Sequence, residues 1–320
     1  MVGAIVGVTV VALMLLAHWV GENTLVLAVV CAMPPQILIA GVFVAGASVV
    51  ALWPRRRLTA SIGVVLLALA VVAVRSSPPP TVASARLRVA AWNIAKGAGG
   101  LEAIARGIAA IGADVVCLSE AGSYRWLRDE DSARLPELLG EPWQLVGDGE
   151  VRALSRLPVV SVSALPLAPG PAARPLLVVG VLQDTTVVSI ACLHLMPKLF
   201  AVADSVDRGE AHDGTASEIV TAIREQGRGL AEHLRSLPRP LIVGGDWNAS
   251  AWGRIVGDVL DDGFVDALAG SGIFARTVGS GLTGRRIDHL LVSDDLRVAR
   301  AEILEVSGSD HLPIVVDVNW

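Results

Sequence analysis

The distribution of charge along the chain constrains its fold more than any other feature. Residues 1–21, 24–53 and 58–74 contain no Asp, Glu, Lys or Arg, whereas a globular mixture of residue types begins near residue 86. These apolar runs explain why 53% of the chain is hydrophobic. We therefore predict a membrane region over residues 1–75 with about three transmembrane helices, a Pro-rich linker over 76–86, and one domain with a large core over 87–320.

Basic residues predict how this membrane region is oriented. No positive segment precedes residues 2–20, which favours a retained anchor over a cleaved signal peptide. The arginines at 55–57 predict a cytoplasmic loop between the second and third runs, so the third run delivers the domain to the outside. If residues 24–53, which include Pro34 and Pro35, crossed twice, the domain would be cytoplasmic, but this run is short for two helices. We expect a multi-pass protein of the cell membrane whose extracytoplasmic domain is held close above the bilayer.

The cysteines and the charge exclude several classes of site. Cys31 lies in an apolar run, Cys117 and Cys192 lie in apolar strand patterns, and no Cys-x-x-Cys occurs, so a zinc ribbon or redox pair has no support. We expect Cys117 and Cys192 to be buried free thiols rather than a disulfide. The net charge of −5 and the scarcity of lysine, found at Lys96 and Lys198, argue against a broad surface for binding polyanions.

In the domain, polar side chains stand where apolar strand patterns end. Residues 240–244 are apolar and lead into Gly245, Asp246, Trp247 and Asn248. Such a strand places its polar residues at the rim of a sheet, where a ligand or metal can reach them. The same plan recurs at Asn93, Glu120 and His194.

Two further groups, Asp288 and the pair Asp310 and His311, come before their strands instead. If all these residues share one rim, the last two strands run against the others, and the sheets are mixed or antiparallel. Apolar spacing predicts surface helices over residues 101–111, 123–139 and 215–237. The pattern therefore favours an α/β sandwich of two sheets with helices outside.

The ordered set of short motifs resembles the endonuclease/exonuclease/phosphatase superfamily, which has the DNase I-like fold. A further segment at 154–159 looks like the Leu-Ser-Arg-x-Pro stretch of that family. Each motif alone is unspecific, but six in this order across residues 88–318 are specific. The resemblance implies a four-layer α/β sandwich of two mixed β-sheets and phosphoester hydrolysis that depends on Mg²⁺ or Mn²⁺. The matching motifs are Trp92-Asn93, Leu118-Ser119-Glu120, Leu193-His194, Gly245-Asp246-Trp247-Asn248, Ile287-Asp288-His289 and Ser309-Asp310-His311-Leu312-Pro313.

Roles for the metal-binding and substrate-binding residues follow from the resemblance. It makes Glu120 the main metal ligand, with Asp310 and Asn93 near the metal, and hard oxygen ligands of this kind suit Mg²⁺ or Mn²⁺ rather than zinc. Some members carry an acidic residue where this chain has Ala95, so a second metal at that spot is in doubt. Lys96 and Lys198 each follow a site residue closely. We expect them to contact a substrate phosphate, or else to lie in solvated loops.

The catalytic roles are implied in the same way. Asp246 and Asn248 hold the nucleophilic water and a phosphate oxygen. His311, oriented by Asp288, is a base or a phosphate clamp, and His194 protonates the leaving group or stabilises the transition state. Independently of the resemblance, phosphoryl hydrolysis needs a held water, a stabilised phosphate and a proton for the leaving group.

The fold does not choose a substrate, because the superfamily hydrolyses DNA, RNA, inositol phosphates, sphingomyelin and other phosphoesters. An anchored external domain is similar in arrangement to actinobacterial teicoplanin-resistance membrane proteins. This arrangement predicts that the substrate is a lipid-linked phosphate or diphosphate of the cell envelope. The alternatives are a tethered extracellular nuclease, which would need a basic face, and a non-catalytic ligand-binding domain of the same fold.

Overall fold

The computed structural model describes residues 85–122, 129–168, 174–196, 216–272 and 275–320. The predicted membrane region, the linker up to residue 84, and Lys198 lie outside the described residues. Within the described ranges, no helix is both long enough and apolar enough to cross a membrane.

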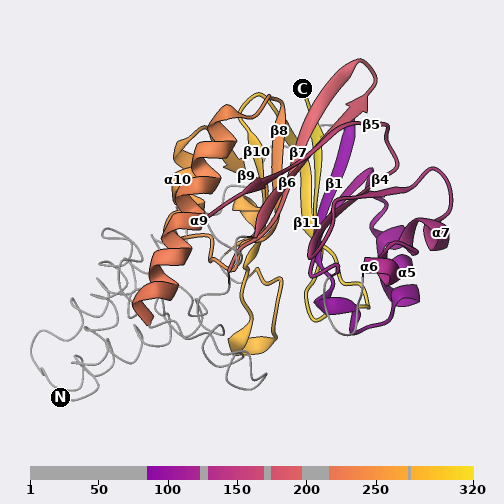
Figure 1. Ribbon diagram of the computed structural model, residues 1–320, viewed down its shortest axis with the longest axis horizontal. Coiled ribbons are helices and arrows are strands. Elements are labelled where there is room, and N and C mark those ends of the chain that lie inside the picture. Colours follow the sequence, from indigo (N-terminus) through magenta and orange to yellow (C-terminus); the bar gives the residue numbers. More distant parts are fainter. Residues whose placement is uncertain (1–84, 123–128, 169–173, 197–215, 273–274) are drawn as a thin grey trace, which may run out of the picture.

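Two six-stranded sheets pack face to face (Figure 1). The first sheet has the order β11-β12-β1-β2-β4-β3, and the second has the order β5-β6-β7-β8-β10-β9. The strands of the first are β1 (Leu87–Asn93), β2 (Val115–Ser119), β3 (Gln144–Val146), β4 (Val151–Ser155), β11 (Arg297–Ile303) and β12 (Ile314–Asn319). Those of the second are β5 (Val159–Pro166), β6 (Pro175–Gln183), β7 (Thr186–His194), β8 (Leu241–Asp246), β9 (Phe264–Asp266) and β10 (Asp288–Ser293).

Both sheets are mixed, and their strand directions bring six strand ends to one edge. β1 and β2 are parallel, as are β7 and β8. β12 runs against β1, and β10 runs against β8. The predicted reversal of the last strands is therefore confirmed. The carboxyl ends of β1, β2, β7 and β8 meet the amino ends of β10 and β12.

Helices cover the outer side of each sheet, so that four layers result (Figure 1). On the first sheet lie α5 (Leu101–Ile111), α6 (Asp129–Ser132) and α7 (Leu135–Leu139). On the second lie α9 (Ala216–Ser236) and α10 (Arg254–Asp261). Within the described ranges there are also three short 3₁₀ turns: η1 (Ala95–Gly97), η2 (Ala269–Ser271) and η3 (Gly281–Thr283).

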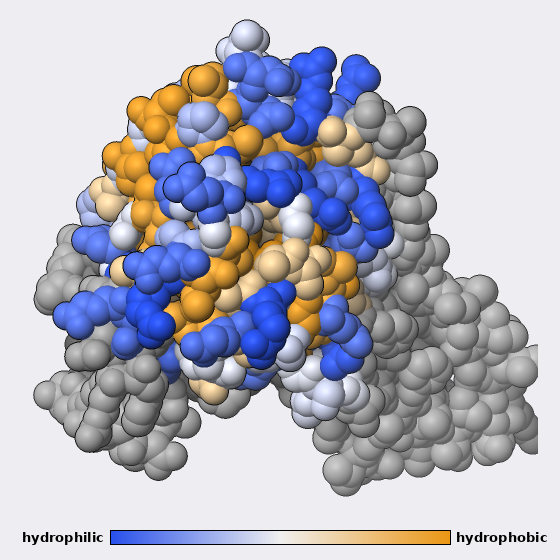
Figure 2. All heavy atoms as spheres, turned by 90° about the vertical axis from the view of Figure 1, so that its right-hand side faces the viewer, coloured by the Kyte–Doolittle hydropathy of each residue, from blue (hydrophilic) through white to orange (hydrophobic). Residues whose placement is uncertain are grey.

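Apolar side chains are gathered in three clusters, one between the sheets and one under the helices on each side. Outside these clusters, hydrophilic and hydrophobic residues are interspersed on the face shown in Figure 2. In the described ranges, the large apolar side chains that stay exposed belong to several elements: Leu138, Val160, Val162, Val187 and Val265.

The helix predicted over residues 123–139 is the clearest correction to the expected elements. Two short helices, α6 and α7, occupy residues 129–139, and residues 123–128 lie outside the described ranges. Pro136 stands in the first turn of α7, where its missing N–H is harmless, but it would break a helix continuing from upstream. The helices predicted over 101–111 and 215–237 are confirmed as α5 and α9 to within one residue at each end.

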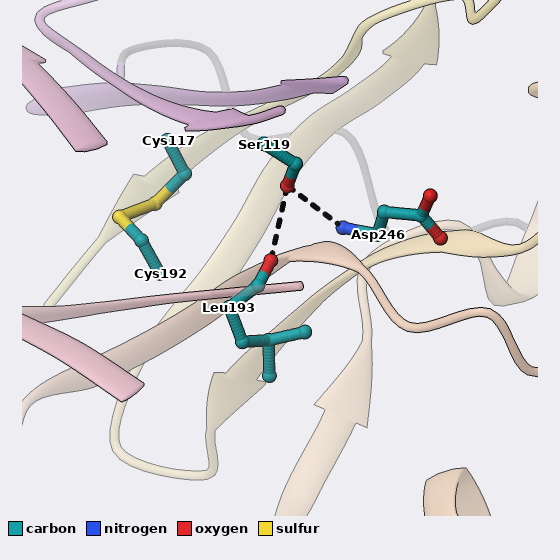
Figure 3. Close-up of a disulfide and its surroundings, with 5 residues drawn as sticks. All are labelled: Cys117, Ser119, Cys192, Leu193 and Asp246. Atoms are coloured by element: carbon teal, nitrogen blue, oxygen red, sulfur yellow. Dashed lines mark hydrogen bonds between the residues drawn. A yellow bond between two sulfur atoms is a disulfide. The ribbon is translucent and has the colours of Figure 1, made fainter. Parts of the chain in front are cut away.

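The expectation of free thiols at Cys117 and Cys192 is wrong, because the two form a disulfide (Figure 3). Cys117 is on β2 of the first sheet, and Cys192 is on β7 of the second. Their Cα atoms lie 5.2 Å apart across the core, which is within the range that a disulfide spans. An apolar strand pattern fits a buried thiol and a buried disulfide equally well, and the sequence does not reveal that these two strands face each other.

We expect Gly107→Ala to destabilise the protein. A Cβ atom added to Gly107 on α5 would lie 2.7 Å from Cη2 of Trp92. The indole is held in place because its Nε1 donates to the backbone oxygen of His311 at 2.9 Å. Overpacking of this kind costs about 1–3 kcal/mol. Thermal unfolding of the full chain measures the loss.

Gly257→Ala on α10 is the matched control, because no atom lies within 4 Å of its added Cβ. This replacement should stabilise the helix by roughly 0.5–1 kcal/mol. Equal melting temperatures for the two variants would contradict the tight contact between Gly107 and Trp92.

Candidate active site

The edge where the strand ends meet holds all the predicted site residues that lie in the described ranges. Along the second sheet, His194 on β7 is the register partner of Asp246 on β8, and Asp246 is the partner of Asp288 on β10. From the first sheet come Asn93, at the end of β1, and Glu120, directly after β2. The site is therefore assembled from both sheets.

Asp246 is the centre of this arrangement. Its Oδ2 accepts from Nδ2 of Asn93 at 3.0 Å, and its Oδ1 accepts from the backbone N–H of Asn248 at 2.8 Å. Nε2 of His194 lies 3.8 Å from Oδ2. Asp246 and Asp288 are both buried and directly opposed, an arrangement in which like charges repel. Nearby cations or hydrogen-bond donors offset this repulsion.

His311 supplies one such cation. Its Nδ1 donates to Oδ2 of Asp288 at 2.9 Å. Burial alone would lower the pKa of His311, but the charge and hydrogen bond of Asp288, together with the charges of Asp246 and Asp310, raise the pKa to about 10. His311 is therefore protonated at neutral pH. Of the two roles considered for it, donation to a phosphate oxygen fits this state and proton abstraction does not.

A second carboxylate–histidine pair, which sequence reasoning missed, lies beside the first. Oε2 of Glu150 is 3.4 Å from Nδ1 of His194, and Oε1 of Glu150 is 2.9 Å from Nε of Arg174. Arg174 also donates to the backbone oxygen of Leu195 at 3.0 Å. Glu150 stands in the turn before β4, where an acidic residue looks like an ordinary turn residue, so no sequence signal marked it.

The residues present fit a divalent cation. Asn93, Lys96, Glu120, Asp310 and His311 line one cleft of about 960 Å³. Nε2 of His194 lies 4.0 Å from Oε1 of Glu120. Hard, anionic oxygens facing a cleft are the ligands that Mg²⁺ or Mn²⁺ prefers.

A second compact group also has metal-ligand chemistry. Atoms of Asp246, Asp288 and His311 lie within 4.8 Å of one another, and Oδ1 of Asp288 is buried without a hydrogen-bond partner in the described structure. However, Oδ2 of Asp288 and Nδ1 of His311 already bind each other. Two of the ligand atoms in this second group are therefore already engaged with each other.

Unusual backbone conformations gather around the cleft. Ala95, Lys96, Glu120 and Asn248 have φ angles of 47°, 54°, 54° and 47°, a region that non-glycine residues rarely adopt. Such conformations cost roughly 1–3 kcal/mol each and persist where the surroundings enforce them. One reason is visible at Ala95, whose N–H donates to Oδ1 of Asn93 at 2.9 Å and so turns the Nδ2 group of Asn93 toward Asp246.

His289 lies on the other side of its strand from Asp288, as the alternation of β10 predicts. Its Nε2 donates to the backbone oxygen of Ala249 at 2.8 Å, and its ring meets Trp247 edge-on with centroids 5.9 Å apart. Burial lowers the pKa of His289 to about 4. The neutral ring thus packs behind the loop that carries Asn248 and supports it.

The burial of neutral His289 predicts a loss of stability in acid. Its pKa falls from an ordinary 6.5 to about 4 on folding, so its contribution is complete above pH 6.5 and disappears as the pH falls toward 4. A depression of this size corresponds to about 3 kcal/mol. Denaturant unfolding of the full chain between pH 4 and 7 measures it.

His289→Gln, which keeps an N–H donor for Ala249, should show a flatter stability profile over the same pH range. An unchanged profile in this variant would assign the acid sensitivity to another group.

Comparisons with known proteins agree with this geometry. Residues 90–311 match the model of the endonuclease/exonuclease/phosphatase family, whereas the comparison with curated proteins found no match. An endonuclease/exonuclease/phosphatase from Bacteroides vulgatus has a TM-score of 0.55 at 17% identity, covering 73% of this chain and 98% of its own.

Two further solved structures are similar to the chain. For a 3′-5′ exonuclease from Neisseria meningitidis, the TM-score is 0.53 at 20% identity, with coverage of 73% of this chain and 100% of its own. For an endonuclease/exonuclease/phosphatase from Beutenbergia cavernae, the TM-score is 0.52 at 20% identity, with coverage of 74% and 72%. At these identities the likeness establishes the fold.

Proposed function

Because the chain belongs to the endonuclease/exonuclease/phosphatase family, we propose that it is a membrane-anchored, metal-dependent phosphoesterase acting on a lipid-linked phosphate or diphosphate at the outer membrane surface. Members of this family are phosphoester hydrolases. The observation that carries hydrolysis here is the His311–Asp288 hydrogen bond, with His311 in the same cleft as the Glu120 carboxylate. His311 donates a hydrogen bond to a phosphate oxygen, and the Glu120 carboxylate provides an oxygen ligand for a cation.

The residues divide the chemistry as follows. Glu120, with Asn93 and Asp310, would hold Mg²⁺ or Mn²⁺, and a bound ion neutralises charge on the phosphate oxygens. His311 donates its Nε2 proton to another phosphate oxygen.

Two residues of the second sheet serve the proton transfers. Asp246 orients the attacking water and accepts the proton that this water loses as it bonds to phosphorus. Nε2 of His194 faces the same space, 3.8 Å from Asp246, and donates a proton to the leaving oxygen.

Two features support an external site on a membrane-bound protein. The apolar runs before residue 75 supply the anchor in this proposal. The Cys117–Cys192 disulfide is independent support, since structural disulfides persist in oxidising compartments and are rare in the cytosol. The lipid substrate is inferred from the proximity of a tethered site to phosphate-bearing lipids.

A direct assay tests the proposal. The full chain in detergent micelles, with Mg²⁺ or Mn²⁺, should release phosphate from a polyprenyl diphosphate, and His311→Ala should lower kcat by about 10²- to 10⁴-fold. The histidine on α9, His233, is outside the site and serves as the matched control in a His233→Ala variant. Hydrolysis that survives in the His311→Ala variant would contradict the assigned site.

The same assay decides between the alternatives. Plasmid DNA and sphingomyelin are included as competing substrates, because the fold is shared with the 3′-5′ exonuclease from Neisseria meningitidis. Plasmid nicking that depends on His311 would replace the lipid proposal with a nuclease. The net charge of −5 argues against that result. The shared cleft of Asn93, Glu120 and His311 argues against a non-catalytic domain.

A further inference from the structure

The two halves of the site belong to different sheets, and this raises the question of what fixes their separation. Asn93 and Glu120 extend from the first sheet, whereas His194 and Asp246 extend from the second. Each sheet is held by its own backbone ladder, but no ladder joins the two sheets in the described structure. Their spacing at the site must therefore come from side chains.

The sheets approach unusually closely just behind the site. Stacked sheets are typically about 10 Å apart, yet the Cα atoms of Cys117 and Cys192 are 5.2 Å apart. Nearby, a Cβ added to Gly244 on β8 would lie 3.3 Å from the Cβ of Ala91 on β1. Small residues permit this convergence, and the disulfide makes it covalent.

Ser119 extends the connection from the disulfide to the site itself (Figure 3). It follows Cys117 by two residues on β2. Its Oγ donates to the backbone oxygen of Leu193 at 3.1 Å and accepts from the backbone N–H of Asp246 at 3.4 Å. Glu120 directly follows Ser119 at the end of β2, and His194 directly follows Leu193 on β7. One hydroxyl thus ties three strand ends that carry site residues.

We propose that the Cys117–Cys192 disulfide and the Ser119 hydroxyl are positioning groups that set the distance between the two halves of the site. The inference rests on the function proposed for that site. Catalytic groups must be held within about 0.5 Å of their productive geometry. A covalent link two residues before His194, and three before Glu120, restrains both chain segments over that short distance.

The link is a permanent restraint rather than a reversible switch. Cys117 and Cys192 are 1% and 0% exposed, so a reductant in solution does not reach them in the folded protein. The bond forms during folding, when two thiols lose two protons and two electrons to a disulfide oxidant, which is itself reduced to two thiols.

The test compares two ways of weakening the same core in the full chain. The first variant combines Cys117→Ala with Cys192→Ala, and the matched control is Val188→Ala, a buried residue of the same apolar cluster on β7. Cys31→Ala controls for the loss of a thiol. Three quantities are measured well below the melting temperature: kcat, Mn²⁺ affinity by electron paramagnetic resonance, and the ring ¹H–¹⁵N signals of His194.

We expect the double cysteine variant to lose about tenfold or more in kcat and to shift the His194 ring signals. Mn²⁺ affinity should change less than about twofold, because the assigned ligands all extend from the first sheet. Val188→Ala should lower the melting temperature and leave the three quantities unchanged. If the double variant melts earlier but keeps the kcat and the His194 signals of the wild type, the disulfide only stabilises the fold and the proposal is overturned.

Two further arms keep the proposal testable. Ser119→Ala retains the disulfide, and it should lower kcat severalfold and shift the His194 signals in a normally folded protein. Wild-type values in this variant would contradict the positioning role of Ser119.

If the wild type hydrolyses none of the substrates, the proposed function fails. The His194 signals then test the positioning role alone, and unchanged signals in both variants would exclude it.

Discussion

Asp288→Asn is expected to lower kcat by about 10²- to 10⁴-fold and to lower the pKa of His311 from about 10. The carboxylate is the partner that keeps His311 protonated, through a 2.9 Å hydrogen bond to Nδ1. Without it, burial favours the neutral ring, which can no longer act as a cation toward phosphate. Titration of the histidine ring by NMR, in the presence of a chelator, measures the shift.

The same variant should change how stability depends on pH. In the wild type, the folded pKa of His311 lies above its ordinary value of 6.5. Its stabilising contribution is therefore complete below pH 6.5 and is lost as the pH rises toward 10. In Asp288→Asn this alkaline loss should be smaller, and denaturant unfolding between pH 6.5 and 10 measures it.

Asp266→Asn is the matched control, because Asp266 is also a carboxylate in an ion pair and is half-buried. It accepts two hydrogen bonds from Arg286, at 2.6 Å and 3.0 Å, away from the cleft. This variant should unfold more easily and leave the His311 titration unchanged. If the pKa of His311 fell equally in both variants, the specific Asp288–His311 pair would not be its cause.

The second large effect is expected from Glu120→Gln. This change preserves the shape of the side chain but removes the anionic oxygen that we assign to the metal. Mn²⁺ affinity should fall at least about tenfold, and kcat at saturating Mn²⁺ should fall by about 10²-fold or more. Electron paramagnetic resonance of free Mn²⁺ gives the affinity without any substrate.

Glu102→Gln, an exposed glutamate in the first turn of α5, controls for a general change in charge. It should bind Mn²⁺ as the wild type does. Full Mn²⁺ affinity in Glu120→Gln would move the metal to the group formed by Asp246, Asp288 and His311.

The sequence indicated the residues of this site because its signals are local. An apolar strand that ends in Asp246, or one that begins after His311, can be recognised within a few residues. The order of these signals also predicted that the last strands are reversed, as the pairing of β10 with β8 confirms.

What the sequence could not indicate depends on contacts between distant strands. Glu150 reaches His194 only because the turn before β4 lies next to the end of β7. Cys117 and Cys192 are 75 residues apart in the chain, and only the stacking of the sheets brings them together. Such contacts have no periodic signature along the chain.

The direction of β1 has a consequence for how a tethered domain would meet its substrate. β1 starts at Leu87 and ends at the site residue Asn93, about 20 Å further on, and the paired β12 returns the chain end to the starting side (Figure 1). The start of β1 and the site are therefore at opposite ends of the domain.

Under the proposed topology, an upright domain would point its cleft away from its own bilayer. Residues 76–86, if extended, would span about 30 Å, which exceeds the length of β1. The domain can then lie on its side and bring the cleft down to lipid headgroups. Shortening residues 76–86 should therefore reduce hydrolysis of a membrane substrate and leave hydrolysis of a water-soluble substrate unchanged.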